Sequence, residues 1–276
     1  MKILDGLELS GYIKERQLKQ VRALRQSWRV FPRLAIVMTI DNPVIDTYVR
    51  LKKAYGEDIG IDVDIHKVDQ SQILELIAKL NQDELVHGII IQLPIADMSQ
   101  VDAAVNAVAK EKDVDGLGQD GIFTPATAMA IDWLLAGYNV TLANKTIAIV
   151  GKGRLVGGPL AKLWRSQGLN NITVYDGKTL DLASELQKSD LIVTATGVPS
   201  LITRDMVQPG AVIVDAGTAS EQGKIVGDLA PDVRDLDDIT ITPIKGGVGP
   251  LTVAALFDNV IRAARIVADR KGQQDL

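Results

Sequence analysis

Short apolar runs rich in β-branched residues alternate with longer stretches of helical period along most of this chain, and this alternation constrains the fold more than any other feature. Each run has the length of a buried strand, and the stretches between them carry apolar residues three and four apart, as amphipathic helices do. Strands that alternate with helices form a parallel sheet covered on both faces. The sequence therefore predicts an α/β fold, with strands at residues 34–40, 61–68, 88–92, 146–151, 172–176, 191–196, 211–215 and 239–242.

The strands fall into two series, and a chain of 276 residues is long enough for two hydrophobic cores. Three glycines and a proline interrupt the pattern at residues 114–128, between the series. We expect an α/β substrate domain at residues 1–120, joined by a C-terminal helix at 251–276 that returns to it. A second domain with a parallel sheet is expected at residues 121–250.

Composition excludes several kinds of function. The net charge of −5 gives no basic surface for nucleic acid. The chain has no cysteine, which rules out disulfides, thiolate catalysis and zinc–sulfur sites, and its two histidines are too few for a histidine-built metal site. The N-terminal stretch carries acids rather than a long apolar segment, so we expect no signal peptide and no membrane span. These features predict a cytoplasmic protein that binds small molecules and no metal.

A glycine loop opens the second series of strands. In TIAIVGKGRLVGGP, residues 146–159, Gly151, Gly153 and Gly157 follow a strand and precede a helix. Their spacing is one residue longer than the common dinucleotide fingerprint, and a tight turn with close helix packing would need the same glycines. The strand–loop–helix context nevertheless favours a pyrophosphate held at the helix N-terminus, so we expect residues 121–250 to form a Rossmann-like nucleotide-binding domain.

Two opposite charges lie where the adenosine ribose of a dinucleotide would bind. Asp176 ends the next strand, and an acid at this place accepts hydrogen bonds from the ribose hydroxyls of NAD. Lys152 and Lys178 lie on the two loops that flank the same ribose, and cations there hold the 2′-phosphate of NADP. The residues leave both cofactors open.

Polar residues also gather near strand ends in the first domain. Asn42 and Pro43 predict a helix start, and Tyr48 and Lys52 lie four apart on that helix, hence on one face. Gln92 ends the strand at 88–92, at the edge where open α/β sheets bind ligands. Asp113 and Asp115 flank the junction, where they either cap a turn or line a site.

Five motifs then resemble the bifunctional methylenetetrahydrofolate dehydrogenase/cyclohydrolase family, in order and in domain position. They are YVRLK at 48–52, GIIIQLP at 88–94, KDVDG at 112–116, GKGRLVGGP at 151–159 and TPIKGGVGPLT at 242–252. The resemblance implies oxidation of 5,10-methylenetetrahydrofolate to the 5,10-methenyl form with NADP, or NAD as the alternative, and hydrolysis of that form to 10-formyltetrahydrofolate. It places the protein in one-carbon metabolism, which supplies purine biosynthesis, and implies a homodimer.

The resemblance also assigns roles residue by residue. Lys52 corresponds to the catalytic acid/base, Gln92 to the residue that bonds and tunes it, Tyr48 to a ring that packs against the folate, and Asp115 to the residue that holds the pterin. The implied substrate-binding residues are Tyr48, Gln92, Leu93, Pro94, Asp115, Gly246, Gly247 and Pro250. The implied cofactor-binding residues are Gly151, Lys152, Gly153, Arg154, Val156, Gly157, Asp176, Lys178 and Thr218.

The chain departs from the family pattern in several places. The connection after Gly116 is shorter, Ile45 stands where a serine is common, and Lys245 interrupts the usual P-V-P-G-G. GKG and YDGKT replace G-R-S and C-H-S-K/R-T, which bears on the choice between NADP and NAD. Two other readings remain: a shikimate-type two-domain dehydrogenase acting on another small substrate, and a paralogue that binds folate or dinucleotide but catalyses little.

Overall fold

Three parallel strands in the order β3-β2-β4 form the sheet of one unit of the computed structural model, which describes residues 1–221 and 224–274. This first unit comprises Gly11–Ala126 and Val253–Leu276, and the second unit comprises Met1–Ser10 and Thr127–Thr252. The strands of the first unit are β2 (Arg33–Met38), β3 (Asp62–Lys67) and β4 (Gly88–Ile91). Its helices are α1 (Gly6–Ser27), α2 (Pro43–Ile59), α3 (Ile73–Gln82), α4 (Val101–Ala107) and α8 (Val248–Gln274), with 3₁₀ turns η1 (Gln70–Gln72) and η2 (Met98–Gln100).

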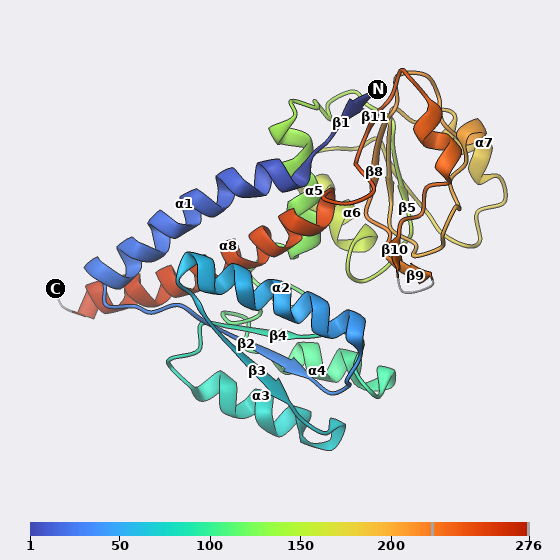
Figure 1. Cartoon of the computed structure of the whole chain (residues 1–276). Helices are drawn as coiled ribbons and strands as arrows, with labels where there is room; N and C mark the ends of the chain where they lie inside the picture. Colours follow the sequence, from blue (N-terminus) through green and yellow to red (C-terminus); the bar gives the residue numbers. More distant parts are fainter. Residues whose placement is uncertain (222–223, 275–276) are drawn as a thin grey trace. The chain divides into compact units, whose positions relative to one another are not determined.

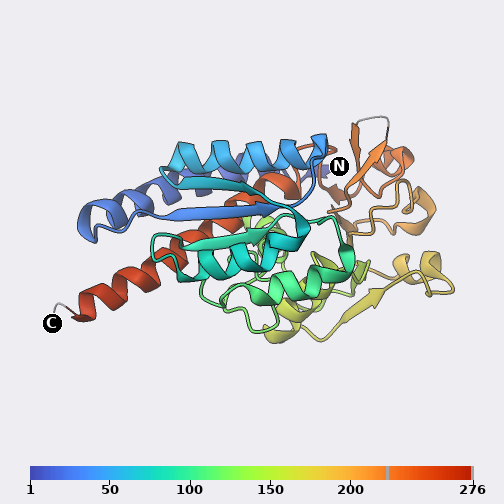
Figure 2. The same cartoon turned by 90° about the horizontal axis from the view of Figure 1, so that it is seen from below.

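Helices cover both faces of the three-stranded sheet, as Figure 2 shows for α2 on one side of the strands and α3 on the other. Ala35, Val37, Ile89 and Ile91 pack with apolar residues of α3 and α4. On the other face, the ring of Tyr55 in α2 stacks on Phe257 of α8 with centroids 5.2 Å apart. Because strand side chains alternate between faces, these two layers bury β2 and β4 almost completely and explain their nearly continuous apolar sequences, whereas the edge strand β3 stays partly exposed.

A six-stranded parallel sheet in the order β1-β11-β8-β7-β5-β6 forms the centre of the second unit (Figure 1). Its strands are β1 (Lys2–Ile3), β5 (Ile147–Val150), β6 (Ile172–Tyr175), β7 (Leu191–Thr194), β8 (Val212–Asp215) and β11 (Thr240–Ile241). Its helices are α5 (Ala126–Gly137), α6 (Gly157–Ser166) and α7 (Leu182–Leu186), with η3 (Arg204–Met206) and η4 (Pro231–Asp235). A separate antiparallel pair consists of β9 (Ala219–Glu221) and β10 (Lys224–Val226).

Different helices pack on the two faces of this sheet. Ala148, Ile192 and Ile213 belong to a core that also contains Leu186 of α7. On the opposite face α6 lies so close to β5 that a Cβ on Gly157 would be 3.2 Å from the side chain of Ile149. The fully buried Trp164 of α6 donates a 2.9 Å hydrogen bond through Nε1 to Asp132 of α5, which joins the two helices.

The structure confirms the predicted α/β class with parallel sheets, and each predicted run contains a strand. The helix start at Pro43 also agrees with the prediction. The predicted boundaries put the first ten residues with the substrate domain, but these residues belong to the second unit. The reason is β1: Lys2 and Ile3 pair with Thr240 and Ile241 of β11, and two residues are too short for a periodic signal.

Candidate active site

Lys52 and Gln92 meet in the first unit, where Lys52 Nζ donates a 2.7 Å hydrogen bond to Gln92 Oε1. Gln92 follows β4, and since Ile89 and Ile91 face α3 and α4, the alternation of side chains directs Gln92 to the face of α2. Its Nε2 donates to Leu93 O at 3.0 Å, and its backbone N–H donates to Val37 O at 2.8 Å. The amide is therefore fixed with its oxygen toward the lysine.

Burial and a neighbouring acid act on Lys52 in opposite directions. Burial lowers the pKa of the Lys52 ammonium because it loses water, while the negative charge of Asp115 raises it. Burial likewise raises the pKa of Asp115, and the charge of Lys52 lowers it. The pair therefore places an amine whose pKa is lowered beside an acid whose pKa is raised, and groups whose pKa is shifted in this way are suited to proton transfer.

Tyr48 lies one helical turn before Lys52 on α2 and is half-buried, and burial raises the pKa of its phenol. Its hydroxyl has no hydrogen-bond partner among residues 1–221 and 224–274. Leu93 and Pro94 follow Gln92 directly, joined by a cis peptide bond. An aromatic face, an amine and an amide therefore share one end of β4.

The two aspartates of KDVDG have different roles. Asp113 is buried, and its carboxylate accepts hydrogen bonds from the backbone N–H groups of Gly116 at 3.1 Å and Gly118 at 2.8 Å. It caps the turn, as one of the two sequence readings expected. Ile89 of β4 bridges to Asp113 in parallel, and Asp115 follows in the turn, close enough for its charge to act on Lys52. Only Asp115 is left to face Lys52.

Asn259 of α8 is a functional residue that the sequence interpretation missed. It is fully buried, and its Nδ2 donates to the backbone oxygens of Val114 and Thr124, both at 2.9 Å. One amide thereby fastens both ends of the shortened connection and fixes the backbone that precedes Asp115. The available signal was a polar residue next to the apolar Phe257 and Val260, both of which are fully buried in α8.

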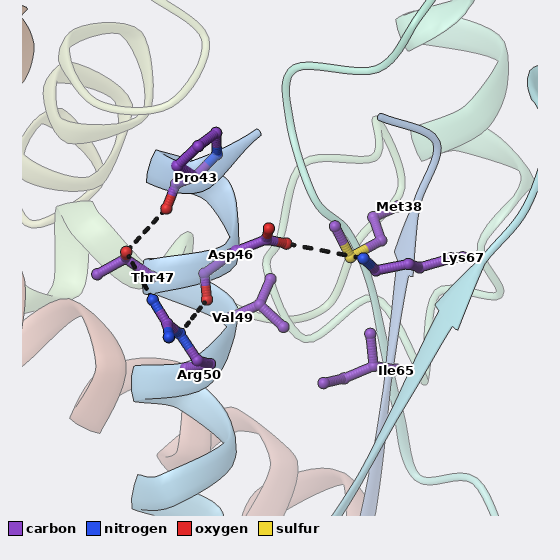
Figure 3. Close-up of a pocket in the computed structure, with 8 residues that line it drawn as sticks. All are labelled: Met38, Pro43, Asp46, Thr47, Val49, Arg50, Ile65 and Lys67. Carbon is purple, nitrogen blue, oxygen red and sulfur yellow. Dashed lines mark hydrogen bonds and ion pairs between the residues drawn. The ribbon is translucent and has the colours of Figure 1, made fainter. Parts of the chain in front are cut away.

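The cavity shown in Figure 3 does not contain Lys52. It has a volume of about 440 Å³ and lies between the N-terminal half of α2 and the ends of β2 and β3. The helix residues lining it are three or four apart and lie opposite the Tyr48–Lys52 face of α2. Lys67 lies 3.9 Å from Asp46 across the opening. The lining residues are Met38, Pro43, Asp46, Thr47, Val49, Arg50, Ile65 and Lys67.

The glycine loop of the second unit has the shape that a dinucleotide requires. Gly151 has φ +106°, and a Cβ on Gly157 would lie only 1.8 Å from Gly151 O, so the loop folds tightly at the start of α6. A Cβ on Gly153 would meet nothing within 4 Å, which leaves the backbone there open. The exposed residues of the loop are Lys152, Gly153, Arg154 and Leu155, and Val156 is half-buried. These residues fit a pyrophosphate held by backbone N–H groups.

Asp176 and Lys178, two of the residues expected at the ribose, directly follow β6, the strand that pairs with β5. Gly151 N donates to Tyr175 O at 2.8 Å, which ties the glycine loop to the end of β6, directly before Asp176. Asp176 and Lys178 are both exposed, and Asp176 Oδ1 accepts a 2.9 Å hydrogen bond from Lys178 N. Thr218 is exposed after β8. Asp176, Lys152 and Lys178 therefore lie on two loops that a backbone hydrogen bond ties together. These residues are compatible with either NAD or NADP.

The third glycine loop, residues 242–247, joins β11 to α8 in the second unit, and Pro250 lies in the first turn of α8. Leu7 N donates to Gly246 O at 2.8 Å, and a Cβ on Gly6 would lie only 1.9 Å from Gly247 O. The first residues of α1 therefore support this loop. Its implied contact with folate remains a prediction.

Histidine contributes little to either unit. His87 is buried before β4, and burial lowers its pKa to about 4, which keeps the ring neutral. Across residues 1–221 and 224–274, no three histidine or acidic side chains gather where they could hold a metal ion. No helix within the same residues combines the length and apolarity needed to cross a membrane.

Two family models match the chain. The tetrahydrofolate dehydrogenase/cyclohydrolase catalytic domain matches residues 4–115, and the NAD(P)-binding domain of the same family matches residues 125–268. The bifunctional protein FolD of Campylobacter jejuni is 36% identical over 280 residues, which cover 96% of this chain and 99% of that protein.

Solved structures agree with these matches. The crystal structure of the bifunctional enzyme FolD from Campylobacter jejuni superposes with a TM-score of 0.90 at 35% identity, covering 96% of this chain and 99% of that chain. The FolD of Trypanosoma brucei, complexed with NADP and an inhibitor, has a TM-score of 0.89 at 27% identity, covering 96% of this chain and 97% of that chain. The likeness therefore extends along nearly the whole length of each protein.

Replacing Asn259 by leucine tests whether this side chain stabilises the backbone between Val114 and Thr124. Asn259→Leu keeps the branched shape of the side chain but leaves the oxygens of Val114 and Thr124 without their donor, so we expect a loss of about 1–3 kcal/mol in the free energy of unfolding. Urea denaturation followed by circular dichroism measures this loss. Asn170→Leu makes the same chemical change at an exposed position and should cost little. Equal stability of the two variants would contradict the role given to Asn259.

Proposed function

The chain belongs to the tetrahydrofolate dehydrogenase/cyclohydrolase family, and from that premise we propose which of its residues carry the two activities. The protein oxidises 5,10-methylenetetrahydrofolate to 5,10-methenyltetrahydrofolate and hydrolyses the methenyl form to 10-formyltetrahydrofolate, in one-carbon metabolism. The observation that carries the residue assignment is the hydrogen bond of 2.7 Å between Lys52 and Gln92.

In this proposal Lys52 is the acid/base. Hydrolysis of the methenyl cation needs a water molecule that loses a proton and a group that takes and returns it. Burial brings the pKa of Lys52 down toward the range where the amine can do this. Gln92 accepts from Nζ and so fixes its direction, which favours one geometry of proton transfer.

The neighbouring residues bind and orient the substrate. Asp115 carries a carboxylate that can accept hydrogen bonds from the amino and N–H groups of a pterin, and the ring of Tyr48 offers an apolar face to the aromatic part of folate. Leu93 and Pro94, next to Gln92, would complete the wall around the one-carbon unit. Gly246, Gly247 and Pro250 are proposed as folate contacts because of the family motif alone.

The second unit binds NAD(P), which accepts the hydride when bound. The loop from Gly151 to Gly157 would hold the pyrophosphate through its backbone and Arg154. We propose NADP as the preferred cofactor, with Lys152 and Lys178 beside the 2′-phosphate, because the Trypanosoma brucei relative is complexed with NADP. Asp176 makes NAD the alternative, and Thr218 is proposed as a further contact.

Three further features rest on the family resemblance. We propose that the protein is a homodimer, that it works in the cytoplasm, and that neither activity needs a metal ion. Sedimentation and assays after chelation can test the first and the last. A shikimate-type function would leave Gln92 and the loop after β11 without a role. The reading as a weakened paralogue rested on the short connection after Gly116, which Asp113 and Asn259 hold in a defined turn.

The acid/base assignment is tested by Lys52→Met. We expect hydrolysis of methenyltetrahydrofolate to fall by about 10²-fold or more, because methionine cannot exchange a proton. Binding of NADP, measured by calorimetry, should be unchanged. Lys53→Met, at the exposed neighbouring position, serves as the control and should retain activity. Undiminished hydrolysis in Lys52→Met would refute the assignment.

The pH dependence of hydrolysis tests the pairing of Lys52 with Asp115. If the neutral amine is the base, the rate rises with pH and levels off above the pKa of Lys52. Asp115→Asn removes the negative charge that raises this pKa, so the rising limb should move to lower pH. Asp46→Asn, on the opposite face of α2, should leave the limb in place. A limb that moves up or stays fixed in Asp115→Asn would contradict the pairing.

Cofactor choice is tested by two single substitutions. Lys152→Ala should reduce the ratio of kcat/KM for NADP over NAD by about tenfold, the loss of one charge-assisted phosphate contact. Asp176→Ala should raise the same ratio because it removes the acid that bonds the ribose of NAD. Lys162→Ala, exposed on α6, is the matched control. If neither substitution shifts the ratio, ribose recognition lies elsewhere.

A further inference from the structure

Two aspartates lie at the carboxyl edge of the sheet in the second unit, Asp215 at the end of β8 and Asp228 shortly before η4. Asp228 is 0% exposed. Gly217 lies between them: its N–H donates to Asp215 Oδ1 at 3.0 Å, and a Cβ on Gly217 would lie 2.1 Å from Asp228 Oδ1. The two carboxylates therefore belong to one tightly packed cluster.

One oxygen of Asp228 organises the end of β7. Asp228 Oδ2 accepts a 2.6 Å hydrogen bond from Thr194 Oγ1 and a 2.7 Å hydrogen bond from Thr196 N. Thr194 is the last residue of β7, and Thr196 lies in the loop that leaves it. A single carboxylate thus fixes both the strand end and the first turn of the loop, which we call the β7 loop, Thr194 to Val198.

The β7 loop in turn packs against the glycine loop. Ala195 N donates to Val150 O at 2.9 Å, and a Cβ on Gly151 would lie 2.6 Å from Ala195 O. Ala216 N donates to Thr194 O at 2.8 Å, which adds the end of β8. The exits of β5, β7 and β8 are therefore linked at the edge where open parallel sheets bind dinucleotides.

The other oxygen of Asp228 has no such partners. Asp228 Oδ1 is buried without a hydrogen-bond partner in the described part of the chain. A buried carboxylate oxygen without a partner lowers stability, which offsets part of what the hydrogen bonds to Oδ2 contribute. Burial and the charge of Asp228 also raise the pKa of Asp215, another sign of the cost of holding two acids together.

We propose that Asp228 is a positioning residue for the dinucleotide, because its carboxylate sets the β7 loop against the glycine loop that receives the cofactor. The inference rests on NAD(P) binding by this unit and adds a residue outside the glycine fingerprint. Hydrolysis of the methenyl form needs no dinucleotide, so the two activities should respond differently to its loss.

Three substitutions at and beside Asp228 test this, with Kd for NADP and NAD measured by calorimetry on the full chain. Asp228→Ala removes both hydrogen bonds and should raise the Kd by about tenfold or more. Asp228→Asn keeps one acceptor oxygen and should show a smaller loss. Thr194→Val removes only the hydroxyl donor and should have the smallest effect. Methenyltetrahydrofolate hydrolysis without nucleotide should stay within about twofold in all three, since a positioning role spares that step.

Ile192→Ala separates positioning from simple destabilisation. Ile192 is a fully buried core residue of β7. Its truncation should therefore lower the melting temperature and leave the Kd unchanged. An unchanged Kd in Asp228→Ala, or a Kd that rises equally in Ile192→Ala, would overturn the proposal. If Asp228→Ala does not fold, unchanged Kd values in Asp228→Asn and Thr194→Val overturn it instead. Binding of neither nucleotide by the unmodified protein would contradict this inference and the proposed function together.

Discussion

The hydrogen bond between Lys52 and Gln92 decides what the first unit can do. A lysine on α2 would ordinarily extend into water, where its ammonium stays charged and mobile. Here the amide of Gln92 accepts from Nζ at 2.7 Å, and burial disfavours the charge that this bond favours. The hydrogen bond fixes the direction of the Lys52 amine, and burial makes its charged form easier to deprotonate. The other residues of the site either position the amide of Gln92 or surround the amine of Lys52.

The supports of the site come from parts of the chain far apart in sequence. Gln92 takes its direction from the alternation of β4, whose core packs on α3 and α4. Asp113 fixes the turn after KDVDG, and Asn259 of α8 fastens the backbone on both sides of it. The second unit repeats the principle with Asp228, whose carboxylate fixes a loop beside the glycine fingerprint. In both units a buried polar side chain fixes the backbone beside the groups that act.

Periodicity predicted the strands and the α/β class because buried parallel strands leave a continuous apolar signal. The motif at Gln92 was predictable for a related reason, since an amide at the end of an apolar run has few structural explanations. Asn259 was missed because its acceptor Val114 O lies 145 residues away, and no local pattern records such a pair. Lys2 and Ile3 were missed because their pairing with β11 depends on the assembled sheet. Asp228 was missed because its hydrogen-bond partners, Thr194 and Thr196, belong to β7 and the loop after it, and no local pattern around Asp228 indicates them.

The most direct measurement is a titration of the Lys52 side chain by NMR, with lysine labelled at Cε and the signal assigned through Lys52→Met. The account predicts a pKa below the ordinary lysine value of about 10.4, and a further decrease in Gln92→Leu, because the lost oxygen favoured the charged amine. A Lys52 signal that titrates in the ordinary range, and does not move in Gln92→Leu, would contradict it.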